Sequence, residues 1–434
     1  MTLSLGIDIG TSGVRAVVID PALQICAMAR SEHLPQDPER INADLWWHAV
    51  LQCLSCLGEQ MREAGRDPAE VAYFCVDGTS GSMVLTNANL RPVSRALMYN
   101  SKGFDAEAKR IAEYAPNAHI TQGSNSALAR ALRLLDKAPQ ADHLLHQADF
   151  VAAKLTGIGG QSDVMNALKT GIDPETADWP DWISELLPSA VLPKAHALRT
   201  PFGVLVHPDV IALGFAPSAQ VLAGTTDSIA AFLAAAPLEP GVGVTSLGST
   251  LAVKMLSARR IDDPAAGLYA HRVGNVWLVG GASNTGGRVL AEFFSPQRIR
   301  ELSAQIDISA PTNLDYYPLL DLGERFPVND PLLEPRLTPR PKDDVQFLHG
   351  LFEGIARIEA QCYAVIAAKG GGCPHRVLSA GGGTTNSAFF AIRAKELGLM
   401  PERPTQSEAA FGTAQIAFLS ADKTYPPRQE RMTK

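Results

Sequence analysis

A turn rich in glycine and hydroxyl groups follows the first apolar run of the chain. From Leu3 the sequence reads LSLGIDIGTSGVRAVVID, with Asp8 in the apolar run and then the set Gly10, Thr11, Ser12 and Gly13. Backbone amides and short hydroxyls in such a turn bind phosphate oxygens. Asp8 is expected at the end of the strand, where its carboxylate suits Mg²⁺, an ion that keeps much of its water shell. The stretch therefore predicts a phosphate site with a magnesium ion, held by Asp8 through water. The alternatives are that Asp8 caps the turn and that residues 10–13 form a simple hairpin turn.

The elements that position this turn are two strands rather than a strand and a helix. The run VRAVVID after Gly13 is rich in β-branched residues and prefers a strand. The stretch GVGVTSLGSTLAVKML, from residue 241, repeats the order of strand, turn and strand. No G-x-x-x-x-G-K-[ST] run occurs, and the first turn does not open a helix as a dinucleotide-binding G-x-G-x-x-G does. We therefore expect two related α/β halves, residues 1–220 and 221–434, with a ligand cleft between them.

Helical patterns fill much of the remaining first half. The stretch from Asn42 to Gly65 predicts a helix with Asn42 as its N-cap, and the Ala/Leu-rich residues 105–160 are expected to be helical. Cys53 and Cys56 form a CxxC in the middle of the first of these helices, without a second pair for zinc. We interpret both as core cysteines.

Composition excludes several classes of partner. The 38 basic and 45 acidic residues give a net charge of −7, which offers no electrostatic case for nucleic acid or an anionic membrane. No apolar run is long enough for a membrane span, and no signal peptide is recognised. The 6 cysteines are scattered, which is typical of a reduced, cytoplasmic protein.

Four motifs in order along the chain resemble those of the FGGY carbohydrate kinases: GIDIGTSG, GTTDSIAAFLAA, TSLGST and AGGGTTN. They are similar to the family's phosphate, catalytic, phosphate and adenosine motifs. Longer stretches, among them LLHQADF, DVMNALKTGIDPE and LVGGASNTGG, resemble the D-ribulose kinase branch known from plants and cyanobacteria. The resemblance implies an α/β fold of two duplicated actin-like (ribonuclease H-like) ATPase domains with a central cleft.

The activity that the resemblance implies is transfer of phosphate from Mg²⁺–ATP to D-ribulose, giving D-ribulose 5-phosphate. The alternatives are a xylulose kinase, a broad pentulose or polyol kinase, and an actin-like ATPase that does not act on sugars. Phosphoryl transfer needs mainly positioning and charge neutralisation. By resemblance Asp227, in AGTTDS, is the catalytic base that takes the proton of the sugar hydroxyl, and its alternative role is a helix N-cap.

Further site residues are also implied by the resemblance. Asp8 and Asp227 are expected to be catalytic and to contact the substrate. The expected ATP-binding residues are Gly10, Thr11, Ser12, Gly13, Gly248, Ser249, Thr250, Gly286, Gly287, Gly382, Gly383, Asn386 and Phe389. Asn386 is in addition a candidate N-cap, and Phe389 could equally be an ordinary helix-core residue.

The sugar side is expected in the stretch VDGTSGSMVLTN, where Asp77, Thr79 and Ser80 resemble the family's sugar-facing loop. The alternative is a turn stabilised by its own Asp, Ser and Thr side chains. Most FGGY kinases carry W-x-D-x-R after this stretch. Here Tyr99 replaces the tryptophan, Ser101 the acid and Gly103 the arginine, which affects the sugar site rather than the nucleotide site.

Overall fold

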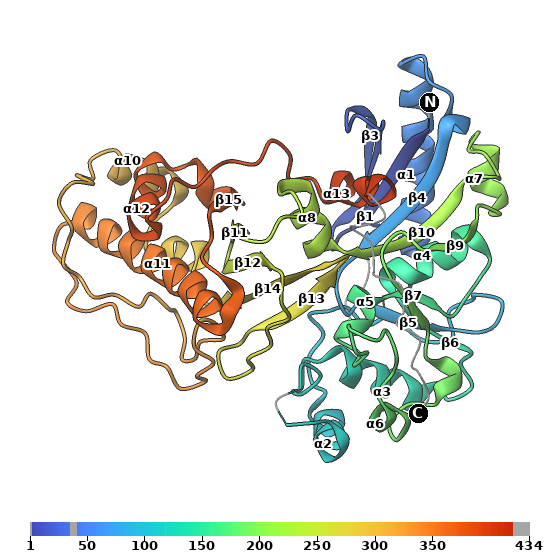
Figure 1. Ribbon diagram of the computed structural model, residues 1–434, viewed down its shortest axis with the longest axis horizontal. Helices are drawn as coiled ribbons and strands as arrows, with labels where there is room; N and C mark the ends of the chain where they lie inside the picture. Colours follow the sequence, from blue (N-terminus) through green and yellow to red (C-terminus); the bar gives the residue numbers. More distant parts are fainter. Residues whose placement is uncertain (1, 35–40, 118, 420–434) are drawn as a thin grey trace. The chain divides into compact units, whose positions relative to one another are not determined.

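The structure is a computed structural model that describes residues 2–34, 41–117 and 119–419, apart from the side-chain surroundings of residues 383 and 384. The chain forms two compact units (Figure 1). The first contains Met1–Ala234, Arg272–Asn275 and Gln406–Lys434, and the second contains Ala235–His271 and Val276–Thr405. The sequence places the boundary after residue 220, whereas the first compact unit continues through Ala234 and also takes in a C-terminal segment.

The first unit is built on a six-stranded sheet in the order β3-β2-β1-β4-β10-β9. Its strands are β1 (Leu3–Ile9), β2 (Gly13–Ile19), β3 (Ile25–Glu32), β4 (Val71–Gly78), β9 (Pro201–Val204) and β10 (Gln220–Thr226). Strand β1 is antiparallel to β2 and parallel to β4, which is in turn parallel to β10. The smaller pairs are β5 (Met83–Thr86) with β6 (His143–His146), and β7 (Gln161–Asp163) with β8 (Lys194–His196).

The helices of the first unit are α1 (Asp44–Glu63), α2 (Asp105–Tyr114), α3 (Ala127–Lys137), α4 (Gln147–Thr156), α5 (Val164–Leu168), α6 (Asp181–Ser184), α7 (Pro208–Ala212), α8 (Asp227–Ala235) and α13 (Ala409–Gln415). Of these, α1, α4, α5 and α13 contact the six-stranded sheet, whereas α2 and α3 pack together beside β5. Three 3-10 turns, η1 (Pro68–Glu70), η2 (Ser189–Val191) and η5 (Ile416–Phe418), complete the unit. No helix in the described part of the chain is long and apolar enough to cross a membrane.

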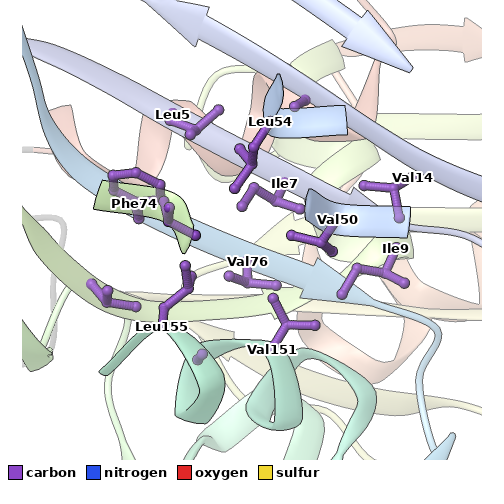
Figure 2. Packing of buried hydrophobic residues seen from close by; sticks show 14 of the residues in the cluster. Leu5, Ile7, Ile9, Val14, Val50, Leu54, Phe74, Val76, Val151 and Leu155 are labelled. Atoms are coloured by element: carbon purple, nitrogen blue, oxygen red, sulfur yellow. The ribbon is translucent and has the colours of Figure 1, made fainter. Parts of the chain in front are cut away.

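The two faces of β1 have different surroundings. Successive side chains of a strand point to opposite faces. One face buries Leu5, Ile7 and Ile9 in a cluster that includes side chains of β4, α1 and α4 (Figure 2). The other face carries Ser4, Gly6 and Asp8. A side chain at Gly6 would collide with the backbone of α13, so a glycine here allows that helix to approach the sheet.

The second unit is built on a five-stranded sheet in the order β13-β14-β12-β11-β15. Its strands are β11 (Val242–Leu247), β12 (Leu251–Ser257), β13 (Tyr269–Val273), β14 (Val276–Ser283) and β15 (Arg376–Ala380), although the last two residues of β13 are grouped with the first unit. The helices are α9 (Gly287–Phe293), α10 (Pro296–Ser303), α11 (Asp344–Ile366) and α12 (Ser387–Leu397), with the π-helical turn η3 (Ala367–Gly371) and the 3-10 turn η4 (Gly382–Thr385). Its core gathers apolar side chains from the sheet, α11 and α12.

The structure confirms both predicted hairpins, β1–β2 and β11–β12. It also confirms a helix within residues 42–65, but the N-cap is Ala43 rather than Asn42, whose Oδ1 accepts from Asp44 N at 2.9 Å. Two further expectations are wrong. Residues 105–160 are interrupted by β6, because Leu144 and Leu145 are buried against β5 instead of forming a helical stripe. Cys53 is buried in the core, but Cys56 lies on the exposed side of α1.

Candidate functional site

A row of polar side chains crosses the sheet of the first unit on the face that α13 covers. Asp8 of β1 is in register with Asp77 of β4, which is in register with Thr225 of β10. Paired residues of neighbouring strands point to the same face. Asp8 and Asp77 are 3% and 0% exposed, so the row is almost closed to solvent. Thr413 of α13 donates a hydrogen bond to Asp77 Oδ2.

The electrostatics of this row follow from burial. Burial raises the pKa of Asp77 well above its usual value, and the charges of Asp8 and Asp227 raise it further. Burial also raises the pKa of Asp8, although a hydrogen bond with Asp77 and the guanidinium of Arg15 oppose that change. Arg15 Nη1 lies 3.2 Å from Asp8 Oδ2. The two carboxyl groups therefore keep a proton to higher pH than exposed carboxyl groups do.

Asp227 is at the junction where β10 ends and α8 begins. It is partly exposed, in contrast to the buried carboxylates of Asp8 and Asp77, and it is close enough to raise the pKa values of both. The backbone N–H of Ser228 donates to Asp227 Oδ1 at 2.6 Å. Asp227 thus combines a local role at the start of a helix with a carboxylate that a ligand can reach.

The first hairpin turn, residues 10–13, is held from both sides by backbone bonds. Gly10 N donates to the Gly13 carbonyl at 2.9 Å, and His33 N donates to the Ser12 carbonyl at 3.0 Å. A side chain at Gly13 would collide with the Ser31 carbonyl, so a glycine is required there. Thr11 and Ser12 are exposed, which leaves their hydroxyls accessible to a phosphate.

In the loop after β4, the predicted sugar-binding residues Thr79 and Ser80 have different hydrogen-bonding surroundings. Thr79 is buried, with its N–H and hydroxyl donating to Gln147 Oε1 at 2.9 and 2.7 Å. Ser80 Oγ is buried without a hydrogen-bond partner among the described residues. Ser80 therefore has unused hydrogen-bonding capacity, whereas Thr79 is used to hold the loop on Gln147, at the start of α4.

A buried arginine fixes the same loop, and the sequence analysis missed it. Arg130 of α3 is 2% exposed, and it donates to the carbonyls of Gly81, Tyr99 and Asn125 at 2.9, 3.1 and 3.1 Å. Burial lowers its pKa to about 10. Nothing in the sequence around Arg130 marks it, because its partners are carbonyls from three separate segments.

The substituted W-x-D-x-R positions lie beside this loop. Tyr99 is 45% exposed, and its N–H donates to Ser82 Oγ at 2.9 Å. Ser101 accepts a hydrogen bond from Met98 N at 3.2 Å, so its hydroxyl stabilises its own turn. Gly103 has a φ of +89° and open space around it.

In the second unit, three glycine turns border one cavity of about 380 Å³. Its lining residues are Leu247, Gly248, Ser249, Gly286, Gly287, Arg288, Leu290, Ala291, Ile355, Gly382 and Phe389. Apolar side chains and backbone meet here in the combination that a base and its phosphates require. The cavity thus brings together members of three of the predicted ATP-binding motifs. Thr250 closes the β11–β12 turn, where Gly248 N donates to its carbonyl at 3.1 Å.

The glycines of this cavity allow backbones to approach closely. Gly287 N donates to the Gly248 carbonyl at 2.8 Å, and a Cβ at Gly287 would lie 2.7 Å from that oxygen. Gly286 has a φ of +138°, which disfavours any other residue. A Cβ at Gly382 would meet nothing within 4 Å, so the backbone there faces open space.

Asn386 and Phe389 serve the fold as well as the cavity. Asn386 is the N-cap of α12: its Oδ1 accepts from Phe389 N at 3.0 Å, and its Nδ2 donates to Ser303 Oγ at 2.8 Å. The ring of Phe389 stacks on Phe352, with centroids 4.6 Å apart, while it also lines the cavity. The surroundings of Gly383, in the preceding turn, lie outside the described residues.

Among the described residues, no group of three or more His, Cys, Asp or Glu side chains could hold a metal ion. Magnesium in a phosphate-transfer site needs few protein ligands, because one or two carboxylates are joined by water and phosphate oxygens. Asp8 and Asp77 supply hard oxygen donors, and Asp77 Oδ1 lacks a hydrogen-bond partner among the described side chains. The residues present fit such an ion.

Comparison with known proteins gives a consistent result. The family model for the FGGY family of carbohydrate kinases, N-terminal domain, matches residues 3–234. A xylulose kinase of Streptomyces coelicolor is 27% identical over 278 residues, which are 60% of this chain and 56% of that protein. A glycerol kinase of Roseobacter denitrificans is 25% identical over 273 residues, 57% of this chain and 53% of that protein. These alignments thus span about half the length of the curated relatives.

Solved structures show the fold. A xylulose kinase from Rhodospirillum rubrum superposes with a TM-score of 0.83 at 21% identity, covering 97% of this chain and 91% of that one. A glycerol kinase from Plasmodium falciparum, solved with ADP, gives a TM-score of 0.83 at 14% identity over 98% and 94% of the two chains. The predicted α/β fold of actin-like ATPase type is confirmed. The chain belongs to the FGGY family of carbohydrate kinases.

Proposed function

We propose that the protein is an ATP-dependent pentulose kinase that phosphorylates D-ribulose to D-ribulose 5-phosphate. The observation that carries the proposal is the set of three carboxylates, Asp8, Asp77 and Asp227, at the carboxyl ends of the adjacent strands β1, β4 and β10. Among them Asp227 is partly exposed, whereas Asp8 and Asp77 are buried. A base must reach the hydroxyl from which it takes a proton, and Asp227 satisfies this condition.

In this mechanism the terminal hydroxyl of the sugar attacks the γ-phosphorus of ATP as its bond to the β-γ bridging oxygen breaks. Asp227 accepts the hydroxyl proton, and a positioned base of this kind contributes roughly 10²–10⁴ in rate. Asp8, on β1 and separated from β10 by β4, would hold the magnesium ion through water. When bound, that ion neutralises charge on the transferred phosphoryl group.

The nucleotide is assigned to the two hairpin turns and the cavity of the second unit. Residues 10–13 and residues 248–250 offer backbone amides and hydroxyls to phosphates. The cavity bordered by Gly286, Gly287, Gly382 and Phe389 has the apolar floor that an adenosine needs. Gly383 and Asn386 are also proposed to contact the nucleotide, Asn386 from the position directly after η4.

The sugar is assigned to the loop after β4, with Asp77, Thr79, Ser80 and Asp227 as its polar surroundings. The lack of a hydrogen-bond partner for Ser80 Oγ among the described residues supports Ser80 as a direct ligand, whereas Thr79 and Asp77 are buried and are proposed to support it. D-ribulose is favoured by the motifs shared with the D-ribulose kinase branch. Xylulose is the alternative, favoured by the similarity to the Streptomyces enzyme. The proposed compartment is the cytoplasm.

A coupled ADP-release assay tests the proposal. The panel contains D-ribulose, D-xylulose, L-xylulose, L-ribulose, ribitol, glycerol and a control without sugar. The proposal predicts the highest kcat/KM with D-ribulose and little ADP without sugar. A preference for D-xylulose would show that the substrate is D-xylulose rather than D-ribulose, while the proposed kinase activity would stand. Equal ADP release with and without sugars would indicate an ATPase and reject the proposal.

A further inference from the structure

On its β9 side, the carboxyl end of β10 loses its neighbouring strand before it reaches Asp227, although Thr225 and Thr226 still pair with β4. Strand β10 pairs with β9 only over residues 220–222, and Ala223 then exchanges backbone bonds with Arg199 and Thr200. On the other side its register with β4 shifts between Leu222 and Thr225. The backbone that leads into Asp227 therefore lacks a continuous ladder, and a carbonyl at this position needs another donor.

A side-chain amide supplies that donor. Asn166 of α5 is 0% exposed, and its Nδ2 donates to the Thr225 carbonyl at 2.9 Å. The same Nδ2 donates to Asp163 Oδ2 at 2.6 Å. Both hydrogens of the amide are thus used, and two acceptors fix the orientation of the group. Asn166 Oδ1 has no partner among the described atoms, so the residue contributes to this site as a donor.

Asp163 is itself fixed in place. It is the N-cap of α5, and its Oδ1 accepts from Met165 N and Asn166 N at 2.9 Å each. The chain of contacts runs from the start of α5 through the Asp163 carboxylate and the Asn166 amide to Thr225, two residues before Asp227. Every bond in it lies within the first unit.

We propose that Asn166 is a positioning residue for Asp227: its amide takes the place of a neighbouring strand and fixes the point where β10 turns into α8. This inference rests on the proposed function for the role of Asp227, but the placement of the backbone can be measured without activity. A misplacement of about 1 Å in a reacting group costs about 10²-fold in rate.

Hydrogen exchange tests the placement on the full chain. In Asn166→Ala, the amides of residues 226–229 should exchange at least ~10-fold faster, while those of β1 remain unchanged. Asn166→Ser keeps one donor and should show a smaller increase, which provides a second variant if the alanine variant does not fold. Thr170→Val is the matched control, because it removes the buried bond to His146 Nε2 but leaves Asn166 and Thr225 in place. Unchanged exchange at residues 226–229, or the same increase in Thr170→Val, would overturn the proposal.

Kinetics tests the consequence for Asp227. Asn166→Ala should lower kcat about 10- to 100-fold and leave KM for ATP within about twofold. In an Asp227→Ala background, Asn166→Ala should have no further effect on kcat. A further loss there, or a rise in KM alone, would overturn the positioning role. If the unsubstituted protein shows no sugar-dependent ADP release, the proposed function fails, and hydrogen exchange still decides the role of Asn166 in fixing this backbone.

Discussion

Replacing Arg393 by methionine should destabilise the second unit by about 3–5 kcal/mol, because it leaves a buried carboxylate without its cation. Arg393 and Glu359 are both 0% exposed. Arg393 Nε and Nη2 donate to the two oxygens of Glu359 at 2.6 and 2.7 Å, and Nη2 also donates to Ser379 Oγ at 2.8 Å. After the substitution Glu359 keeps the bond from Thr245 Oγ1, at 2.6 Å. One neutral donor does not compensate a buried charge.

Urea denaturation followed by fluorescence and circular dichroism measures this loss. Arg376→Met is the matched control, since Arg376 forms a similar pair with Glu402 at 2.7 Å on the surface of the same unit. An exposed pair contributes about 0–1 kcal/mol, so the control should change little. The double variant Arg393→Met, Glu359→Leu should recover most of the stability, because an apolar pair replaces the buried ion pair. A loss in Arg393→Met no larger than in the control would refute the reasoning.

Three further changes have defined outcomes. In Gly287→Ala the new methyl group would lie 2.7 Å from the Gly248 carbonyl oxygen. The affinity for ATP, measured by calorimetry, should therefore weaken at least ~10-fold. An unchanged affinity would exclude this turn from the nucleotide site. Arg130→Met leaves three carbonyls without their donor, so KM for the sugar should rise while KM for ATP stays unchanged. Equal rises in the two KM values would show that Arg130 does not act through the sugar loop. The raised pKa of Asp77 means that the folded state holds a proton that the unfolded state releases, so stability should fall as pH rises above the ordinary carboxyl value of about 3.9. Asp77→Asn should flatten that fall in unfolding experiments between pH 4 and 8, and an unchanged slope would contradict the assigned burial cost.

The parts of the fold that the sequence predicts are those fixed by local chemistry. The β-branched runs on both sides of residues 10–13 and 248–250 favour strands, and the glycines between them favour tight turns. Both hairpins follow from these features alone. The helix after η4 follows from Asn386, whose side chain caps α12 as expected.

The parts that the sequence does not predict depend on contacts between distant segments. The stretch HLLH of β6 has the composition of a helix or a strand, and only its pairing with β5 decides between them. The unit boundary depends on α13, which returns to β1 across Gly6 from the far end of the chain. Arg130 and Asn166 bind backbone carbonyls, which leave no signature in a sequence. Asn166 lies in the stretch DVMNALKTGIDPE that carries the resemblance, but the resemblance does not indicate which backbone group its amide binds.

The most direct test of the central claim is single-turnover ADP release with D-ribulose, comparing the unsubstituted protein with Asp227→Asn. The isosteric amide keeps the shape of the side chain and removes its ability to accept a proton. The account predicts a sugar-dependent burst of ADP that Asp227→Asn slows by roughly 10²–10⁴ while ATP still binds. A burst of the same rate in both proteins would show that Asp227 is not the base.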